Sequence, residues 1–460
     1  MADESRAPPH GISFAVAART WARIALLSFG GPAGQIAVMH RILVDEKRWI
    51  GEERFFHALN FCMLLPGPEA QQLAIYVGWL LHRTKGGLVA GILFVLPGLV
   101  AIMALSWLYV LAGDVGPVTA LFFGLKAAVL AIVFQAVARI GRRALGNPAR
   151  LAVAACAFAA IFLLAVPFPA IVLAAGIAGY LPTRAGSRAY GAGGGHGPER
   201  DGSVADAASA LGDSIPDHAR PDRRWALSIG GVLAGLWLAP VALLAALAGP
   251  DNVFTHIGAF FSTMAVVTFG GAYAVLAYVA QAAVGTYGWL TPSEMLDGLG
   301  LAETTPGPLI MVTQFVGFLG AYRHPAGLPP LLAATLGGLL TTWVTFTPCF
   351  LWIFLGAPFV ERLRGNRALA GALSAITAAV VGVVLNLAVW FAIHYLFREA
   401  ARTGLGPLSV EIPRLGSMDP LAALLAGAAL VAMFRFKSGV LPVLGGCALA
   451  GLVARSLLDV

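Results

Sequence analysis

The sequence predicts an all-α polytopic membrane protein of about 13 transmembrane helices, in two inverted repeats whose helices are broken at Gly-Gly(-Pro) and Pro-Gly-Pro motifs. Three observations lead there: composition, run length and an internal repeat. Of 460 residues, 58% are hydrophobic and 12% charged, whereas soluble proteins carry about 25% charged residues. The apolar runs recur at about 20 residues, enough to cross a bilayer. They lack the alternation of a barrel, so the spans should be helices.

The internal repeat is carried by helix-breaking residues and tryptophan. Motifs in the second half follow those in the first by 240 residues (269−29, 289−49, 306−66). The pairs are Phe29-Gly30-Gly31 with Phe269-Gly270-Gly271, Trp49 with Trp289, and Pro66-Gly67-Pro68 with Pro306-Gly307-Pro308. Further on, Pro97 pairs with Pro348 and Gln135 with Asn386, at an offset of 251 (348−97, 386−135). A register held on such residues indicates a duplicated unit.

The apolar runs divide the chain into two repeats and a connection. Residues 1–181 form the first repeat of about six spans, 182–224 a cytoplasmic disordered linker, 225–250 an extra linking span, and 251–460 the second repeat of about six spans. Seven predicted crossings separate the starts of the repeats, and because seven is odd the repeats should be inverted. The spans are 12–39, 55–81, 87–111, 117–138, 151–166, 168–181, 225–248, 253–283, 295–322, 328–355, 369–397, 421–434 and 440–458.

Loop charges predict the orientation. Arginine and lysine gather at 82–85, at 139–143, in the linker, at 362–367 and at 435–437, so a cytoplasmic N-terminus puts all five groups inside, in a bacterial inner membrane. Segments 41–54 and 398–414 break this pattern, and the first is expected to lie at the membrane surface with Trp49 as an interfacial anchor. The net charge of +7 is scattered between spans, so nucleic acid is not an expected partner.

Cofactor and metal sites are not predicted. The four cysteines stand singly in apolar runs, which favours packing roles over a disulfide or a metal site. Nucleotide-binding and hydrolase fingerprints are missing from any credible context, so an enzyme is not expected. The sequence leaves the oligomeric state open, with a homo-oligomer among the choices.

The broken helices predict a transport site. Matched breaks in inverted repeats indicate a secondary transporter with its site near the bilayer midplane. A Gly-Gly-Pro or Pro-Gly-Pro break exposes N–H groups at the start of a half-helix, which carries about half a positive charge and suits an oxyanion. The alternative is that these prolines only kink their helices. Four breaks at matched positions favour the site.

Two cations within the spans fit an anionic substrate. Lys126 lies far from any loop, and intramembrane cations are costly, so they are functional candidates. Arg23 shares a helix face with Arg19 and lies near Gly30, although Arg19 at the start of the span could instead reach the headgroups. Gln135 is out of phase with Lys126, and it is expected to bridge helices, as is Asn386.

Carboxylates near the breaks suggest a second role. Glu69 follows Pro66-Gly67-Pro68 directly, so the helix dipole alone could explain it. A sharper hypothesis makes it a proton-linked switch, in which the ionised carboxylate competes with the substrate. Glu69 matches Leu309 in the repeat, while Glu303 lies just before the second Pro-Gly-Pro, so the two halves are not chemically equivalent.

At these motifs the chain resembles the chromate ion transporter family, in its long two-domain form. The resemblance covers nearly the whole chain outside the linker. The second repeat has Ala272 where the first has Pro32, so its half-helix is expected to start differently. The matching residues are Phe29-Gly30-Gly31-Pro32-Ala33-Gly34-Gln35, Leu65-Pro66-Gly67-Pro68-Glu69-Ala70-Gln71-Gln72, Phe269-Gly270-Gly271, Trp289-Leu290-Thr291-Pro292 and Thr305-Pro306-Gly307-Pro308.

The resemblance implies an inner-membrane protein that exports chromate and confers chromate resistance, with sulfate as the look-alike anion. The residues agree, because tetrahedral dianions suit opposed half-helix N-termini, and the membrane potential or proton motive force would drive export. A transporter of sulfate or another oxyanion would share these motifs. A membrane-embedded enzyme acting on lipid phosphate would need an acid/base pair or nucleophile at the breaks, and Glu69 alone supports it thinly.

Overall fold

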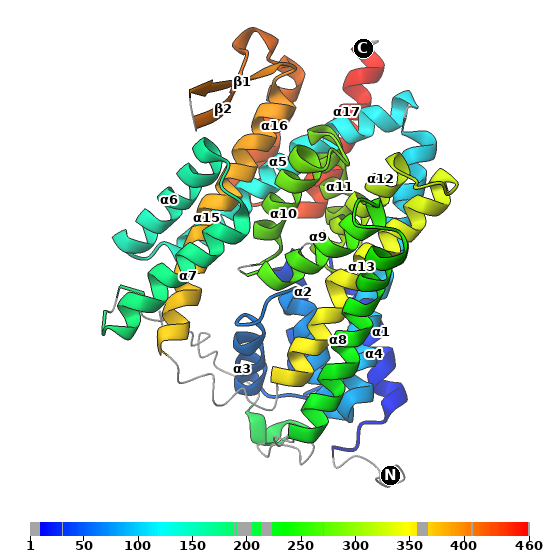
Figure 1. The fold of residues 1–460 in the computed structure, drawn as a ribbon, viewed down its shortest axis with the longest axis vertical. Helices are drawn as coiled ribbons and strands as arrows, with labels where there is room; N and C mark the ends of the chain where they lie inside the picture. Colours follow the sequence, from blue (N-terminus) through cyan, green and yellow to red (C-terminus); the bar gives the residue numbers. More distant parts are fainter. Residues whose placement is uncertain are drawn as a thin grey trace.

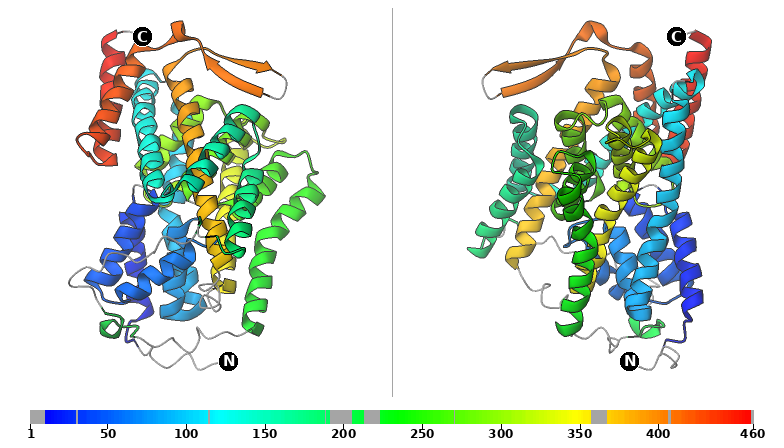
Figure 2. Two further views of the ribbon diagram at one scale, coloured as in Figure 1. Left: turned by 90° about the vertical axis from the view of Figure 1, so that its left-hand side faces the viewer. Right: turned by 45° about the vertical axis from the view of Figure 1, so that its right-hand side comes forward.

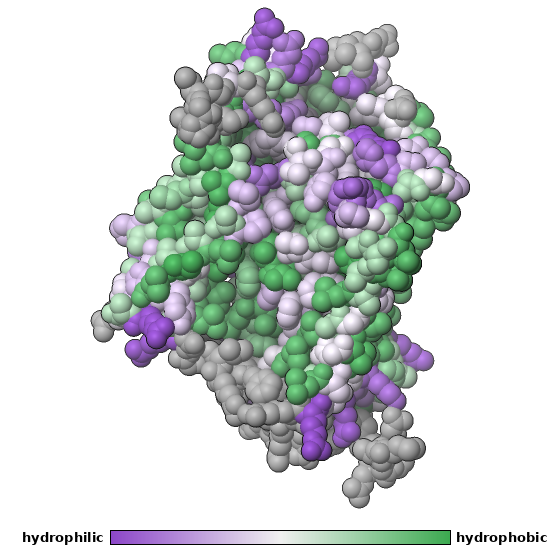
Figure 3. Space-filling view, in the orientation of Figure 1, coloured by the Kyte–Doolittle hydropathy of each residue, from purple (hydrophilic) through white to green (hydrophobic). Residues whose placement is uncertain are grey.

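The protein is described here from a computed structural model covering residues 10–29, 31–113, 115–187, 189–190, 205–212, 223–269, 271–356, 367–405 and 408–458. Helices make up nearly all of this part, which confirms the predicted all-α polytopic membrane protein (Figure 1). Apolar residues cover the middle of the face shown in Figure 3, and hydrophilic ones gather toward its ends. Five described helices are long and apolar enough to cross a membrane: Glu69–Ala112, Gly116–Ala144, Arg224–Leu247, Pro330–Gly356 and Arg367–Leu396.

The first repeat begins with two helical hairpins. The first hairpin joins α1 (Phe14–Leu27) to α2 (Gly31–His40) and the π-helix η1 (Arg41–Glu46), and the second joins α3 (Glu52–Cys62) to the first part of α4 (Glu69–Ala112). An ion pair of 2.8 Å between Arg23 and Glu46 shows that the chain doubles back after α1. Non-helical backbone at His82 and Arg83 divides α4 in two. His82 bonds to the carbonyl oxygen of Ile12, so α4 has returned to the end where α1 started.

The second repeat forms the same pair of hairpins, and their bounds follow the 240-residue offset closely. Arg323 bonds at 2.8 Å to the carbonyl oxygen of Trp289, so α12 ends beside the start of α11. The rings of His256 and Tyr287 lie 5.6 Å apart, so η4 ends beside the start of α9. The elements are α9 (Val253–Val267), α10 (Ala272–Ala280), the π-helix η4 (Gln281–Thr286), α11 (Pro292–Thr304), the 3-10 turn η5 (Leu309–Met311) and α12 (Val312–Arg323).

These hairpins differ from the predicted crossings. Segments 12–39, 55–81, 253–283 and 295–322 were expected to span the bilayer with a break inside. Each instead runs in to its break and returns to the end it came from. The sequence did not distinguish these outcomes, because a long apolar segment with a central Gly/Pro break can either kink within a crossing or fold back. Figure 1 shows α1, α2 and α3 in the lower half of the molecule, with α10, α11 and α12 in the upper half.

The helices that follow the hairpins run antiparallel. In the first repeat this is the second part of α4, and in the second it is α13 (Pro330–Gly356). A Cβ on Gly87, near the start of this part of α4, would lie 2.8 Å from the ring of Phe354 near the end of α13. At the other end, the Trp107 indole donates to Thr335 at 3.0 Å. Corresponding helices that run in opposite directions are what inverted repeats require.

The remaining helices surround this centre. α15 (Arg367–Leu396) packs against α5 (Gly116–Ala144), α6 (Pro148–Leu164) and α7 (Phe168–Arg184), and α16 (Pro420–Phe434) and α17 (Val440–Leu458) pack against α5. α8 (Arg223–Leu247), the predicted extra span, is tied to α13 because the Trp343 indole donates to the Leu236 carbonyl oxygen at 2.8 Å. Leu227 and Leu247 on α8 are 75% and 78% exposed, as expected for lipid-facing side chains.

Segments 41–54 and 398–414, whose charges did not fit the predicted orientation, are ordered by local contacts. Strands β1 (Ala400–Leu405) and β2 (Leu408–Pro413) form an antiparallel hairpin within 398–414, followed by the 3-10 turn η7 (Leu415–Ser417) (Figure 2). Arg398 pairs with Asp419 at 3.1 Å and Arg414 with Glu399 at 2.8 Å, so acids offset these arginines. In segment 41–54, Arg41 pairs with Glu46 at 3.6 Å.

Part of the predicted linker docks on the first repeat. Residues 205–212 contain the 3-10 turn η2 (Asp206–Ala208). The N–H groups of Ala210 and Leu211 donate to the carbonyl oxygens of Arg48 and Trp49, and the Leu211 side chain is buried. The prediction of disorder is therefore wrong for this stretch. Residues 191–204 and 213–222 lie outside the described residues.

Candidate functional site

Four helix breaks meet in the middle of the molecule through two reciprocal hydrogen bonds. The N–H of Gly67 donates to the Thr268 carbonyl oxygen at 3.0 Å, and the N–H of Gly307 donates to the Ser28 carbonyl oxygen at 2.8 Å. Each bond joins the Pro-Gly-Pro motif of one repeat to the residue that ends the helix before the Gly-Gly motif of the other. Donors and acceptors are each 240 residues apart (307−67, 268−28). The structure thus brings the predicted motifs together as matched pairs.

Backbone geometry explains the glycines at these breaks. All four described glycines adopt the left-handed region that side chains disfavour. Their φ angles are +79° at Gly31, +120° at Gly67, +95° at Gly271 and +106° at Gly307. Packing adds a second constraint, because a Cβ on Gly307 would lie 3.0 Å from the Cα of Gly98. Gly30 and Gly270, which were also predicted, lie outside the described residues.

The breaks place four half-helix starts around one small cavity. α2 starts at Gly31, α4 at Glu69, α10 at Ala272 and η5 at Leu309. Helix starts carry N–H groups without intrahelical partners and a partial positive charge. The cavity measures about 10 Å³, close to the room needed by one water molecule and too little for a tetrahedral oxyanion. The site is therefore closed in this conformation. Its lining includes Pro32, Pro68, Glu69, Gly271, Ala272 and Pro308.

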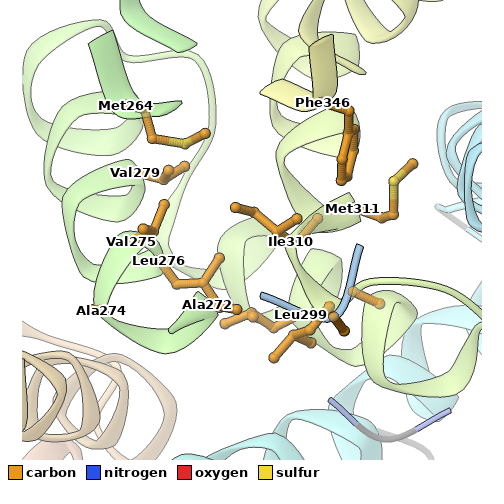
Figure 4. Packing of buried hydrophobic residues seen from close by; sticks show 14 of the residues in the cluster. Met264, Ala272, Ala274, Val275, Leu276, Val279, Leu299, Ile310, Met311 and Phe346 are labelled. Atoms are coloured by element: carbon orange, nitrogen blue, oxygen red, sulfur yellow. The ribbon is translucent and has the colours of Figure 1, made fainter. Parts of the chain in front are cut away.

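Apolar packing holds the second-repeat side of this cavity. Ala272 and Leu276 of α10 point toward Ile310 of η5 and Leu299 of α11 in Figure 4. All four side chains are buried. Apolar packing therefore fixes the position of the start of α10. Ala272 stands where the first repeat has Pro32 (272−240), and the glycines directly before them, Gly31 and Gly271, both have positive φ.

Glu69 is the charged residue in the described lining of this cavity. It is the first residue of α4, and its Oε1 lies 4.0 Å from the position that a Cβ would take on Gly271. The carboxylate thus belongs to one repeat and faces the start of α10 in the other. A negative group at a helix start is stabilised by the helix dipole. Glu69 occupies the kind of place that a bound anion would use.

A second carboxylate lies close by and is deeply buried. Glu303 is 2% exposed, and its Oε1 accepts a hydrogen bond of 2.6 Å from the hydroxyl of Tyr273 in the first turn of α10. The hydroxyl oxygen of Tyr273 is 3.9 Å from the Cβ position of Gly31, the first residue of α2. Glu303 was among the predicted site residues, whereas Tyr273 was not. Tyr273 lies two residues after Gly271, and this closeness to a predicted break was the available signal.

Glutamine amides brace the breaks. Gln35 donates to the Gly307 carbonyl oxygen at 2.6 Å, across the repeats, and Gln72 donates to the Pro66 carbonyl oxygen at 2.7 Å. Both amide atoms of Gln71 are buried without a hydrogen-bond partner among the described residues. Thr305 donates to the Ala302 carbonyl oxygen at 3.3 Å, within its own helix end.

The structure does not bring the two predicted cations to this cavity. Arg23 has a side chain 50% exposed and pairs with Glu46. Lys126 donates to the Ser293 hydroxyl and pairs at 3.2 Å with Asp297, whose other oxygen accepts from Tyr109. The lysine is therefore neutralised inside the protein by a carboxylate that the sequence analysis missed. Asp297 was hard to recognise because 171 residues separate it from Lys126 (297−126).

The residues that were predicted to support the site make packing contacts or local hydrogen bonds. Trp49 is 5% exposed, so the predicted interfacial anchor is wrong; its partner Trp289 is buried and stacks on Tyr287 at 4.4 Å. Phe29 and Phe269 are half-buried beside the breaks. Gln135 forms no bridge to another helix within the described ranges, and its Oε1 accepts from Arg139 on the same helix.

Asn386 lines a larger cavity of about 340 Å³ between α6, α10, η4 and α15. The described residues also include a small cluster of possible metal ligands: His40 at the end of α2, Asp45 in η1 and Glu52 at the start of α3. His40 bonds to Glu52 at 2.8 Å. Neither the larger cavity nor this cluster was predicted, and both lie outside the lining of the central cavity.

Comparisons with known proteins agree with this architecture. The model of the family described as "Chromate transporter" matches residues 16–180 and 255–452, so it matches once in each half of the chain. No solved structure matches the chain.

Relatives match over most of their length. A chromate transport protein of Pseudomonas aeruginosa is 32% identical over 388 residues, covering 83% of this chain and 81% of that protein. One from Cupriavidus metallidurans is 28% identical over 457 residues, covering 95% and 92%. A probable chromate transport protein of Synechococcus elongatus is 27% identical over 368 residues, covering 80% and 81%.

Proposed function

This chain belongs to the chromate transporter family, and we propose that it exports chromate from the cytoplasm across a bacterial inner membrane and so gives chromate resistance. The observation that carries the proposal is the meeting of four half-helix starts around one cavity, two from each repeat. In transporters built from inverted repeats, discontinuous helices of this kind form the substrate site. Secondary transport needs no nucleotide.

The helix starts supply the positive potential that a dianion needs. Each carries about half a positive charge, so four together match a charge of −2 without a lysine or arginine in the lining. Backbone N–H groups also donate hydrogen bonds to tetrahedral oxygens. This arrangement fits the finding that Arg23 and Lys126 are paired with carboxylates elsewhere.

The closed cavity implies a conformational cycle. The reciprocal bonds of Gly67 and Gly307 hold the four starts together, and an anion can enter only if the hairpins move apart. Rocking of one repeat against the other would open the site to each side in turn. We suggest that Glu69 stands at the α10 start while the anion is away and yields that position when chromate binds.

The membrane potential provides a driving force for export. With the N-terminus in the cytoplasm, Arg83 and Lys85 at the bend in α4 lie inside, as the loop charges predict. Moving a dianion out of a negative interior releases about 4–5 kcal/mol per 100 mV.

The test is uptake of labelled chromate and labelled sulfate into inverted vesicles under an imposed potential. Gly31→Ala is the site variant, since its φ of +79° opposes a side chain although the space around it is open. Gly231→Ala on α8 is the matched control, because nothing lies within 4 Å of its added Cβ and its φ is ordinary. We expect potential-dependent chromate uptake that Gly31→Ala abolishes and Gly231→Ala keeps.

Three results would count against the proposal. Uptake of neither anion by the wild type would refute transport, and equal sulfate uptake would make chromate incidental. Full activity in Gly31→Ala would place the site elsewhere.

A further inference from the structure

A buried hydroxyl–carboxylate pair lies beside the candidate site. Glu303 is the last residue but one of α11, and one of its oxygens accepts from Tyr273. Its other oxygen, Oε2, is buried and has no hydrogen-bond partner among the described residues. A carboxylate oxygen in that position is unfavourable, whereas a protonated carboxyl group is neutral and has an O–H to donate. The surroundings therefore favour a Glu303 that takes up a proton during part of the cycle.

Tyr273 connects this carboxyl group to the candidate anion position. Its hydroxyl oxygen lies 2.6 Å from Glu303 and 3.9 Å from the Cβ position of Gly31. Gly31 starts α2, and a helix start is where an oxyanion is stabilised. One hydroxyl group thus stands between a buried carboxyl group and a half-helix start that belongs to the other repeat.

The hydroxyl has a single hydrogen to give. While Glu303 is ionised, its carboxylate accepts that hydrogen, and Tyr273 offers an approaching anion only its lone pairs. Once Glu303 is protonated, its own O–H can donate to the tyrosine oxygen, and the tyrosine hydrogen can turn toward the start of α2. We propose that Glu303 is a proton-binding site and that its protonation, relayed through Tyr273, enables anion binding at the α2 start. This inference rests on the proposed function.

Few other charged groups face Glu303. Arg139 on α5 is exposed, and it is close enough to act electrostatically on both Glu303 and Tyr273. Glu69 faces Gly271, two residues before Tyr273. In the described part of the chain, the other charged or titratable side chains that pair with α11 lie near its first half, around Asp297 and Glu294: they are Lys126, Tyr109 and Arg323.

Linkage fixes the sign of the effect. A proton that promotes anion binding must itself bind more tightly when the anion is present. Anion affinity therefore rises as the pH falls, by at most about tenfold per pH unit for one linked proton. Binding should also draw protons from the solution.

The experiment measures chromate binding to the purified full-length protein in detergent over a series of pH values around neutrality. A pH indicator in weak buffer reports proton uptake, and the same additions without protein correct for protonation of chromate itself. We expect the wild type to take up protons on binding. Glu303→Gln, which imitates the neutral acid, should bind with little pH dependence and without that uptake. Tyr273→Phe should weaken binding roughly tenfold, as expected for one lost hydrogen bond to a charged group, and should flatten the pH profile.

Two control variants separate this effect from general damage. Tyr278→Phe removes a hydroxyl from the same helix, where the ring packs against Phe168 and Phe260, and Glu411→Gln neutralises a carboxylate beside His394. Both should keep the wild-type pH profile. Chromate binding by the wild type without proton uptake would overturn the proposal while leaving transport intact. An unchanged pH profile in Glu303→Gln would also overturn it. If the wild type bound no chromate in any condition, the proposed function itself would fail.

Discussion

The two repeats share a backbone at their breaks and differ in the side chains they place there. Both have glycines at positive φ, and each donates one hydrogen bond to the other. Subtracting 240 from the numbers of the second repeat pairs Glu69 with Leu309, and Glu303 with Met63. Met63 is 52% exposed and Glu303 only 2%, so the same backbone position carries different chemistry. The two repeats therefore share the geometry of the breaks, whereas each has its own carboxylate on a different segment of the hairpins.

The ion pair of Lys126 and Asp297 is the largest difference between the two repeats. The matching positions hold Thr377 and His57 (377−251, 297−240), which cannot form such a pair. Lys126→Met leaves the buried Asp297 without its cation, which should lower the free energy of unfolding by about 3–5 kcal/mol. Denaturation of the purified protein in detergent measures this loss.

The double variant Lys126→Met, Asp297→Leu is the control, since it removes both charges. It should recover much of the lost stability, and its chromate half-saturation should stay near that of the wild type. A stable Lys126→Met protein with a selective loss of chromate affinity would show instead that the lysine contacts substrate.

The two Pro-Gly-Pro glycines should differ in their tolerance of a side chain. Gly307→Ala places a Cβ 3.0 Å from backbone at Gly98, which cannot easily move. Gly67→Ala places one 2.9 Å from the Gln72 amide and 3.1 Å from the Cys349 sulfur, and side-chain atoms can shift more easily than backbone. Both changes strain a backbone at positive φ, at about 1–3 kcal/mol each. We expect Gly307→Ala to lower the melting temperature more. Equal losses of melting temperature would mean that backbone strain alone, and not the neighbouring atoms, determines the cost of the added methyl group.

The unmatched carboxylate of the first repeat can be removed or copied. Glu69→Gln removes the charge at the start of α10, so chromate should bind more tightly, by up to about thirtyfold if the dipole interaction approaches ~2 kcal/mol. Leu309→Glu adds a carboxylate at the matching position of the second repeat and should weaken binding. Equilibrium binding at constant pH measures both. Weaker binding in Glu69→Gln would mean that Glu69 assists the anion rather than competing with it.

The smallest effect is expected far from the breaks, at the start of α16. Burial tends to raise the pKa of Asp419, but the N–H of Ala422 and the guanidinium of Arg398 outweigh it and hold the pKa below its usual value. Asp419→Ala removes this N-cap and should cost about 1 kcal/mol near neutral pH. Because the folded pKa is lowered, the contribution exists above the unfolded value near 3.9 and is lost as the pH falls through the folded value. Transport should be unchanged, and a transport defect would link this end of the protein to the site.

Local patterns made part of this account predictable. The breaks, the repeat and the membrane class could all be derived from the sequence, since Gly, Pro and apolar run length act on the chain nearby. The hairpins could not be derived from the sequence, because the length of segment 12–39 fits either a membrane crossing or a hairpin that returns to the same side. The partners of Lys126 and Glu303 could not be derived either. They come from other helices, and only the packing of the repeats brings Asp297 and Tyr273 beside them.

If the four helix breaks bind the anion, chromium itself can locate that site. A crystal structure of the protein grown with chromate, measured at the chromium absorption edge, gives an anomalous difference map. We predict its strongest peak among the starts of α2, α4, α10 and η5, with Glu69 turned away from Gly271. A peak beside Lys126, or in the larger cavity at Asn386, would contradict the account.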